Sequence, residues 1–486
     1  MTTASLSLGP LAHPVTALSM PLSTWRDLVY LIAIIGFIVA MKGLSSPKRA
    51  RQGNLVGAAS AVLAVAITFT NPVVHHAGKN LALALVAMVL GAAIAVPAAR
   101  LVKMTAMPQM VAIFNGVGGG AASVISVVEL LHWQSLGTKP AVYQIAEVLL
   151  GVLIGTVSFS GSAIAFAKLQ ELMATRPITY PAQQVINAIV ALAIVVLVIL
   201  ALVTGSIVYV WPILALAFVL GVIFVLPIGG ADVPVLISLL NSFTGLAVAA
   251  SGFTLDNNLL IVAGTLVGAS GILLTRLMSK AMGRSLPNVL FSAFGSVVTA
   301  TGGAEGDTDR SVRSSTPDDV GTLLAYARKV VIVPGYGLAV AQAQHVVKEL
   351  VDSLMARGVD VFYAIHPVAG RMPGHMNVLL AEANVPYDEL KEMDEANPEM
   401  STADVALVVG ANDTVNPAAN DTPGSPIYGM PIIHADQAQH VVFLKRSMRP
   451  GFAGIDNELL FDDKTVLLFG DAKDTLQKLV TAVAQA

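Results

Sequence analysis

Long apolar runs dominate the first 284 of the 486 positions, and polar residues gather in short stretches between them. Most runs reach the roughly 20 residues that an α-helix needs to cross a bilayer, although the second and sixth are short. The nine runs cover residues 25–44, 54–70, 80–102, 108–130, 141–168, 185–203, 206–228, 233–252 and 257–280. The pattern predicts a polytopic α-helical membrane bundle of about nine spans over residues 25–284, preceded by an N-terminal tail at 1–24.

Short β-branched runs alternate with helical patterns from Lys329 to the C-terminus. Strand-like runs occur at 330–334, 360–365, 404–410, 430–434, 440–445 and 465–469. Apolar residues at helical spacing separate the first two runs, and further helices are expected at 375–383 and 471–483. Strands that alternate with helices predict an α/β Rossmann-like, doubly wound parallel-sheet domain over residues 329–486.

Residues 285–328 are polar, acidic and poor in large apolar side chains, which predicts a flexible linker between the two regions. The formal charge is +8 for residues 1–284, −2 for this linker and −9 for residues 329–486. Neither the acidic domain nor the scattered basic residues favours nucleic-acid binding. The absence of cysteine excludes disulfides and Cys-ligated metal sites, and we expect no metal centre.

Positive residues are distributed unevenly among the predicted loops. Arg26, Lys79 and Lys139 fall on one side of the bundle. Eleven fall on the other side, namely Lys42, Lys48, Arg49, Arg51, Arg100, Lys103, Lys168, Arg176, Arg276, Lys280 and Arg284. Because positive loops stay in the cytoplasm, an odd number of spans predicts an outside N-terminus and a cytoplasmic C-terminal domain.

The clearest chemical signal runs from Val330 to Val340, where a β-branched strand breaks into a glycine turn and a helical pattern. Its fingerprint is Gly335-x-Gly337-x-x-Val340, with valine where a third glycine usually stands. Such a unit places side-chain-free backbone next to a pyrophosphate, with the positive end of the helix behind it. A bare G-x-G also occurs by chance, so the motif alone is a weak indication of a dinucleotide site.

The second predicted strand ends in Tyr363-Ala364-Ile365-His366-Pro367, with no acid to hold the ribose 2′-hydroxyl of NAD. Lys445-Arg446-Ser447, at the end of a later strand, offers two cations and a hydroxyl to a phosphate dianion. The combination favours NADP(H) over NAD(H). The alternative is an ordinary basic loop at a strand end.

Ionisable residues at membrane depth are costly to bury and commonly mark an ion or proton path. Glu147 lies in the fifth span, Asp232 at the junction of the seventh and eighth spans, and Asn241 further into the eighth. For Asp232 the structural alternative is a helix N-cap, and for Glu147 it is an interhelical hydrogen bond. Glycine-rich stretches such as 116–122 are expected to allow close helix packing.

Longer motifs connect these features to a known family. They are the stretches 335–344, 366–383, 409–419, 443–448, 229–234 and 158–169. From about residue 25 to the C-terminus, the chain resembles the beta subunit of proton-translocating NAD(P) transhydrogenase. The resemblance implies reversible hydride transfer from NADH to NADP⁺, coupled to proton translocation. It also implies NADP(H) on this chain, NAD(H) on a separate alpha subunit, a homodimer of alpha–beta units, and a multi-pass location among the lipids of a bacterial inner membrane.

Carried over by position, the resemblance assigns residues to the cofactor and to the proton path. The expected cofactor contacts are Gly335, Tyr336, Gly337, Ala339, Val340, Arg371, Pro373, Gly374, Asn412, Asp413, Lys445, Arg446, Ser447, Gly451 and Phe452. Asp413 and Arg371, the catalytic candidates, are expected to link nucleotide state to the membrane, and residues 449–454 resemble a lid. The expected proton path is Asn115, Glu147, Ser162, Asp232 and Asn241. Many relatives carry histidine where Asn115 stands, and asparagine cannot replace a titrating imidazole.

A different class of protein shares the broad pattern, namely an ion channel or transporter regulated by a cytoplasmic dinucleotide-sensing domain. Gly335-Tyr336-Gly337 matches part of a potassium-channel filter, but it lies well past the last span and opens a soluble helix. A sensor would bind dinucleotide without transferring hydride. This interpretation is the alternative to the enzyme.

Overall fold

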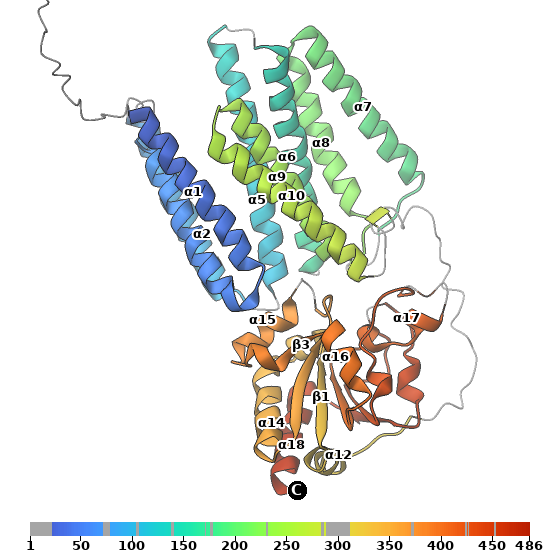
Figure 1. Cartoon of the computed structure of the whole chain (residues 1–486). Helices are drawn as coiled ribbons and strands as arrows, with labels where there is room; N and C mark the ends of the chain where they lie inside the picture. Colours follow the sequence, from blue (N-terminus) through green and yellow to red (C-terminus); the bar gives the residue numbers. More distant parts are fainter. Residues whose placement is uncertain are drawn as a thin grey trace, which may run out of the picture. The chain divides into compact units, whose positions relative to one another are not determined.

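The computed structural model describes residues 22–70, 78–103, 106–137, 140–170, 172–174, 178–229, 232–282, 286–287, 312–370, 374–422, 425, 427–451 and 453–486. The chain divides into two compact units, residues 1–87 and 88–486. Figure 1 follows the chain from blue to red and labels its helices and strands.

The first unit contains α1 (Leu22–Leu44), α2 (Pro47–Thr68) and the start of α4 (Gly78–Leu101). α1 and α2 lie side by side as an antiparallel pair (Figure 1). Their backbones approach closely at two glycines, because a Cβ on Gly43 would lie 2.8 Å from the Cα of Gly53. Tyr30 and Thr68 share a hydrogen bond of 3.0 Å near the other end of the pair.

The second unit begins with the remaining membrane-length helices. They are α5 (Met107–Ser135), α6 (Val142–Leu169), α7 (Gln183–Thr204), α8 (Val210–Val225), α9 (Val233–Thr254) and α10 (Asn258–Ala281). Among the described residues, nine helices are long and apolar enough to cross a membrane, which confirms the predicted bundle. The chain is therefore a multi-pass membrane protein.

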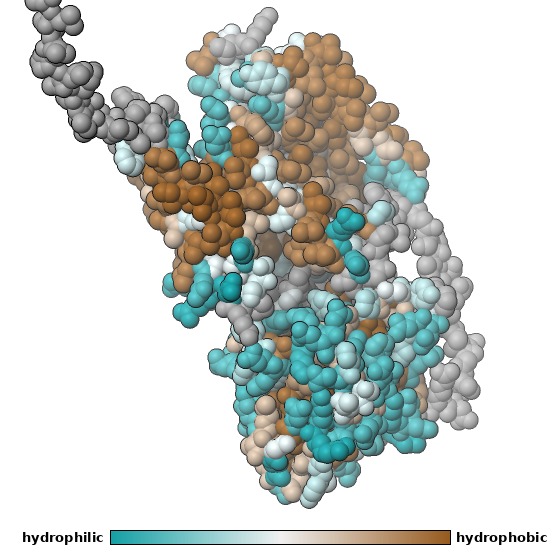
Figure 2. Space-filling view, viewed as in Figure 1, coloured by the Kyte–Doolittle hydropathy of each residue, from teal (hydrophilic) through white to brown (hydrophobic). Residues whose placement is uncertain are grey.

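α6 and α9 form the centre of this bundle. About two thirds of the residues in the most apolar stretch of each helix are buried. Small residues let α5 pack closely against α6, because a Cβ on Gly155 of α6 would lie 2.6 Å from the carbonyl oxygen of Gly119 of α5. α7 instead turns large apolar side chains such as Leu192 and Val203 outward. Figure 2 shows the apolar surface of the helices in brown and the polar surface of the C-terminal domain in teal.

The C-terminal domain is built on six parallel strands. They are β1 (Lys329–Pro334), β2 (Asp360–Ile365), β3 (Leu390–Glu392), β4 (Val405–Val409), β5 (His440–Lys445) and β6 (Thr465–Phe469). Their order is β3-β2-β1-β4-β5-β6, and Val331 lies between Phe362 of β2 and Ala406 of β4. The order reverses between β1 and β4, as in doubly wound nucleotide-binding folds. The Rossmann-like sheet expected from the sequence is confirmed.

Helices and short helical turns cover both faces of the sheet. They are α12 (Pro317–Ala325), α13 (Tyr336–Val340), α14 (Gln344–Ala356), α15 (His375–Glu382), α16 (Met393–Met400), α17 (Ala418–Asp421) and α18 (Ala472–Gln485). The short 3-10 segments of the domain are η4 (Tyr387–Glu389), η5 (Asp413–Val415), η6 (Ala435–Gln437) and η7 (Glu458–Phe461), whereas η2 (Ile207–Tyr209) directly precedes α8 in the membrane bundle.

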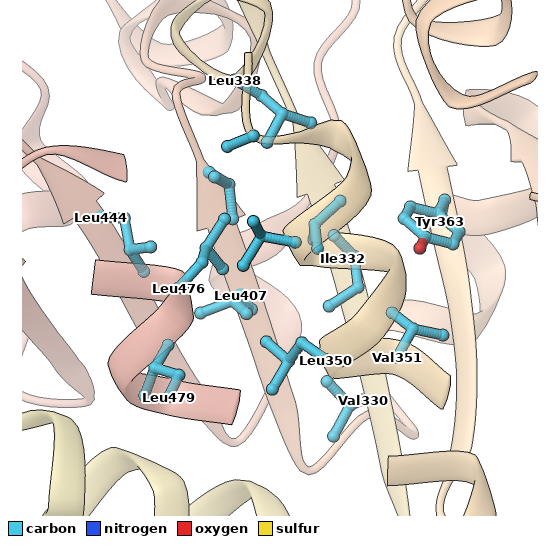
Figure 3. Packing of buried hydrophobic residues seen from close by; sticks show 14 of the residues in the cluster. Val330, Ile332, Leu338, Leu350, Val351, Tyr363, Leu407, Leu444, Leu476 and Leu479 are labelled. Atoms are coloured by element: carbon cyan, nitrogen blue, oxygen red, sulfur yellow. The ribbon is translucent and has the colours of Figure 1, made fainter. Parts of the chain in front are cut away.

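Alternate residues of each strand enter two separate cores. Ile332 and Leu407 pack with Leu350 of α14 and Leu476 of α18 on one face, as Figure 3 shows. Val331 packs with α16 on the other face. Because both faces are buried, the central strands are continuously apolar rather than alternating.

Three local predictions need correction. Residues 430–434 do not form a strand, since Pro431 interrupts the run, and β3, with only three residues, was not predicted. The helix after the glycine turn is also interrupted. α13 ends at Val340, Gln342 adopts a left-handed φ of 49°, and α14 then begins at Gln344.

The boundary of the domain also lies earlier than residue 329. Residues 313–315 pair with β6, since Leu467 donates its N–H to the Arg313 carbonyl at 2.8 Å. α12 then packs on α18 so closely that a Cβ on Gly321 would lie 2.4 Å from the Cβ of Ala482. The last part of the predicted linker, from about residue 312 to residue 328, therefore folds as part of the domain. Of the remainder, only residues 286–287 belong to the described part of the chain.

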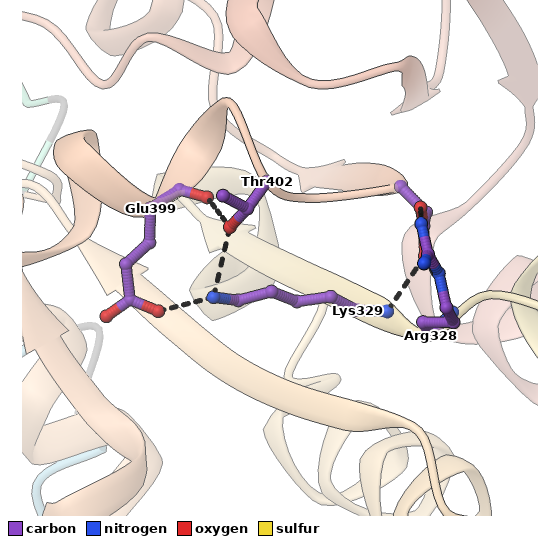
Figure 4. A network of polar contacts seen from close by, with 5 residues as sticks. Arg328, Lys329, Glu399 and Thr402 are labelled. Carbon is purple, nitrogen blue, oxygen red and sulfur yellow. Dashed lines mark hydrogen bonds and ion pairs between the residues drawn. The ribbon is translucent and has the colours of Figure 1, made fainter.

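Charged contacts fasten the amino end of the sheet, as Figure 4 shows. Lys329 Nζ lies 2.5 Å from Glu399 Oε2, and the other carboxylate oxygen of Glu399 accepts from Lys391. Asp404 accepts the backbone N–H groups of Arg328 and Lys329 at 2.7 and 3.1 Å. These contacts join the starts of β1, β3 and β4 and leave the opposite edge of the sheet for the site.

Candidate functional site

A cavity of about 270 Å³ lies at the carboxyl edge of the sheet, where the strand order reverses. Open α/β sheets bind their ligands at this position. The segments that follow β1, β4, β5 and β6 each contribute to the wall. The lining residues are Gly337, Val340, Gly410, Ala411, Asn412, Leu444, Lys445, Arg446, Ser447, Arg449, Gly451, Gly470 and Ala472.

The floor of the cavity is a close crossing of two turns. A Cβ on Gly337 would lie 2.6 Å from the Cα of Gly410, and a Cβ on Gly335 would lie 2.4 Å from the Cα of Ala411. Gly410 has a left-handed φ of 71°, which also favours glycine. These glycines therefore bring backbone against backbone, and Gly337 and Gly410 in addition expose backbone to the cavity.

The opposite wall is positively charged. Lys445, Arg446 and Arg449 line it together with the hydroxyl of Ser447, and none of the lining residues that the structure describes is acidic. Arg446 Nη2 lies 3.1 Å from Asp471 Oδ2, a carboxylate that also caps the start of α18 by accepting from the Lys473 N–H. Three cations, a hydroxyl and bare backbone suit a phosphorylated ligand.

A chain of hydrogen bonds leads away from this wall. Lys445 Nζ donates to Asn412 Oδ1 at 3.0 Å, and Asn412 Nδ2 donates to Asp413 Oδ1 at 3.1 Å. Asp413 Oδ2 then accepts the backbone N–H of Ala453 at 2.8 Å. Burial lowers the pKa of the Lys445 ammonium, and the carboxylates of Asp413 and Asp456 offset part of this effect. The basic wall is thus connected to the loop around Gly451.

His366, which follows β2, is buried and joins two loops. Its Nδ1 accepts the Val368 N–H at 3.2 Å, so Nε2 carries the proton that is donated to the Pro431 carbonyl at 2.7 Å. Burial lowers the pKa of His366 to about 4, partly offset by the bond to Pro431. The imidazole is therefore neutral at pH 7 and holds the loops together.

In the membrane bundle, α5, α6 and α9 share a buried polar network. Asn115 Nδ2 donates to Ser162 Oγ at 2.9 Å and more weakly to Ser158 Oγ at 3.4 Å. Ser158 in turn donates to the Leu240 carbonyl at 2.8 Å and shares a 2.6 Å bond with Thr244. Among the described residues, the buried Asn115 Oδ1 has no hydrogen-bond partner, so the network retains one unsatisfied acceptor.

The carboxylates of the bundle occupy different surroundings. Asp232 is 7% exposed and stands at the N-cap position of α9, but its side chain makes no capping hydrogen bond. Glu147 in α6 and Asn241 in α9 are half-buried. The structure thus joins Asn115 to Ser162 directly by a hydrogen bond between their side chains.

Comparison with known proteins places these features in one family. The family model for the NAD(P) transhydrogenase beta subunit matches residues 26–482. The chain belongs to this family. Two curated relatives, both from Rhodospirillum rubrum and both called NAD(P) transhydrogenase subunit beta, are 48% identical over 460 residues. The match covers 93% of this chain and 98% of each relative.

Membership of the transhydrogenase beta family makes this chain a component of an enzyme complex that handles nicotinamide dinucleotides. The term beta subunit implies an alpha subunit partner. An enzyme subunit, and not a channel regulated by a nucleotide sensor, is therefore the class to which the chain belongs.

The expected cofactor residues of this transhydrogenase subunit fall into three groups. Those that line the cavity are Gly337, Val340, Asn412, Lys445, Arg446, Ser447 and Gly451. Those nearby in the domain are Gly335, Tyr336, Ala339, Gly374 and Asp413, of which Ala339 is fully buried in the core. Those outside the described residues are Arg371, Pro373 and Phe452. Contacts of all these residues with a nucleotide remain predictions.

The structure also adds residues that sequence reasoning missed. Gly470 and Ala472 follow β6 and line the cavity, and Asp471 between them pairs with Arg446. Asn457 donates its Nδ2 to the Asn412 carbonyl at 3.1 Å. The available signal was a glycine directly after a strand and before a helix, in Phe469-Gly470-Asp471.

Proposed function

We propose that the cavity of this chain binds NADP(H) and that an alpha subunit presents NAD(H) to it for reversible hydride transfer. The transfer is coupled to proton translocation by the membrane bundle. The N-terminus lies outside and the sheet domain in the cytoplasm of a bacterial cell, with the bundle among the lipids of the inner membrane. Two alpha–beta units form a homodimer.

The observation that carries the cofactor assignment is the basic wall. Among the described residues, three cations and no acid line the cavity at the carboxyl edge of the sheet. The acid that normally binds the NAD ribose is also missing after β2, where the chain continues His366-Pro367. A phosphorylated ribose, with its dianionic charge, fits this wall better than a free ribose does.

The domain itself supplies position and electrostatics. The nicotinamide provides the hydride chemistry when bound, and no general acid or base of the chain is required for that step. Gly337 and Gly410 leave room for the close approach of backbone to the pyrophosphate, and Lys445, Arg446 and Ser447 hold the 2′-phosphate. The two nicotinamide rings must then meet across the subunit interface at van der Waals distance.

Coupling requires two states of the domain with different affinities for NADP⁺ and NADPH. The hydrogen-bonded chain Lys445–Asn412–Asp413–Ala453 supports this proposal, because it links the phosphate wall to the loop that contains Gly451. A change in the partners of Lys445 would therefore reach Asp413. Arg371 is proposed to assist in the same transition.

In the bundle, we assign the proton path to Asn115, Ser162, Glu147, Asp232 and Asn241. The buried Asn115–Ser162 bond and the unpaired Asn115 oxygen support a water-filled section between α5 and α6. Asparagine itself does not titrate near neutral pH, so the proton must move on water and on the carboxylates.

The test is reconstitution of the chain and its alpha partner in vesicles with a pH-sensitive dye inside. The proposal expects NADH-dependent reduction of an NADP⁺ analogue, accompanied by a change in internal pH. Asp232→Asn is expected to suppress both the pH change and the release of NADPH. Nucleotide binding without hydride transfer in the assembled complex would contradict the proposal.

A further inference from the structure

Lys168 is the most unusual buried charge in the described bundle. The sequence prediction placed it among the cytoplasmic loop cations, but it lies in the last turn of α6 with 0% exposure. Its Nζ donates to three backbone carbonyls, those of Val225 at 3.3 Å, Leu226 at 2.5 Å and Ile228 at 2.7 Å. Among the described residues, no carboxylate lies within ion-pair distance of it.

The three carbonyls belong to the end of α8 and to the turn that follows it. The last carbonyls of a helix lack partners within the helix and carry the negative end of its dipole. An ammonium group has three N–H donors, and the site presents three acceptors. A neutral amine would instead turn its lone pair toward a carbonyl oxygen. The geometry therefore fits a lysine that stays cationic and not one that delivers protons.

The turn after α8, whose carbonyls bind Lys168, leads directly to Asp232. Ile178 donates its N–H to the Leu226 carbonyl at 3.1 Å, and Asp232 donates its N–H to the Gly229 carbonyl at 3.0 Å. Val225 and Ile228 pack in one apolar cluster with Leu169 of α6 and Val233 of α9. The end of α6 is itself held by Gln109 of α5, which donates Nε2 to the Leu169 carbonyl at 3.1 Å.

We propose that Lys168 is a positioning residue, a built-in cation that locks the α8–α9 turn and so fixes Asp232 at the start of α9. The positioning role rests on the proposed function of Asp232 in the proton path. The binding of the three carbonyls by Lys168, which we call the clamp, does not depend on that function. Loss of the cation removes one donor from each of the three carbonyls, although the Val225 and Leu226 carbonyls still accept from the N–H groups of Ile228 and Ile178. The missing donors are then replaced by water that enters the turn.

The clamp is tested by the accessibility of the turn. The chain has no cysteine, so Ile228→Cys introduces a single thiol at a position that is 2% exposed. In the full chain in membranes, Lys168→Met is expected to raise the rate of maleimide labelling at position 228 by about tenfold or more, the factor that one charged hydrogen bond is worth. Lys280→Met removes an exposed lysine from the last turn of α10 and is the matched control.

Arginine and glutamine variants separate charge from chain length. Lys168→Arg retains a cation and is expected to keep labelling slow, whereas Lys168→Gln, with two donors and no charge, is expected to accelerate it. If Lys168→Met does not accumulate in the membrane, the comparison of Lys168→Arg with Lys168→Gln decides the test. Equal labelling rates in the cationic and neutral variants would overturn the clamp.

The positioning role is tested in vesicles that contain the complete complex. In Lys168→Met, proton uptake per hydride transferred is expected to fall, with recovery in Lys168→Arg. Faster labelling with an unchanged ratio would show that the clamp is purely structural and would refute the positioning role. If Asp232→Asn also leaves the ratio unchanged, the proposed proton path is wrong, whereas the labelling result still decides the clamp.

Discussion

Replacing Gly410 with alanine is expected to destabilise the sheet domain and to abolish tight NADP(H) binding. Gly410 has a φ of 71°, which costs an alanine about 1–2 kcal/mol. The new Cβ would also lie 2.4 Å from the Leu338 nitrogen and 2.5 Å from the Gly337 Cα, where ordinary contacts begin at 3.4 Å. Separating the two turns by about 1 Å adds about 1–3 kcal/mol. The expected loss in the free energy of unfolding is therefore about 2–5 kcal/mol.

Hydrogen–deuterium exchange of peptides from β1 and β4, in the full chain in detergent, measures this loss. A loss of 2 kcal/mol or more accelerates exchange of these core strands by about 30-fold or more. Gly358→Ala is the matched control, because Gly358 has a φ of 86° but no atom within 4 Å of a new Cβ. If Gly410→Ala loses no more stability than Gly358→Ala, the close crossing of the two turns does not determine the site.

Three further outcomes are expected. Lys445→Met weakens NADPH binding in fluorescence titrations by about 10- to 100-fold and leaves NADH binding unchanged, whereas Lys478→Met, at an exposed lysine, changes neither affinity. Burial raises the pKa of the Asp404 carboxyl, but hydrogen bonds from Arg328 and Lys329 lower it by more. The Asp404 carboxylate therefore stabilises the folded domain above about pH 4, and this contribution is lost as the pH falls. Asp404→Asn should therefore lose about 1–2 kcal/mol in urea unfolding at pH 7 and converge with the parent chain in acid. Ser162→Ala removes the closer of the two hydroxyl groups to which Asn115 donates and slows coupled proton uptake by about tenfold; unchanged uptake would exclude this pair from the path.

Most of the fold follows from local properties of the sequence. The length of each apolar run sets a membrane span, and continuous β-branched runs mark strands that are buried on both faces. The errors have local causes as well. Residues 430–434 are apolar because Ile432 and Ile433 are buried in a loop, not because they form a strand.

The linker prediction was wrong at residues 312–328, because a helix start has the same polar and acidic composition as a linker. Thr316-Pro317-Asp318-Asp319 is acidic and polar, which suggested disorder. In the structure the Thr316 side chain accepts from the Asp319 N–H, and Pro317 and the two acids occupy the first turn of α12. Such residues are also the preferred start of a helix, so composition alone could not decide between the two.

The site was only partly predictable because its walls come from four separate strands. The basic run at Lys445 and the glycine turn at Gly335 are visible in the sequence. The juxtaposition of Gly337 with Gly410, and the contribution of Gly470, depend on the strand order. Similarly, Lys168 resembles a loop cation in the sequence, and only the end of α8 reveals its partners.

The most direct test of the central claim is the selectivity of the full chain for its dinucleotide, measured by titration without the alpha partner. The account predicts that NADPH binds at least about 100-fold more tightly than NADH, since two or more charged contacts to the 2′-phosphate distinguish them. It further predicts that Lys445→Met reduces this ratio. Equal affinities, or tighter binding of NADH, would contradict the assignment of the basic wall to NADP(H).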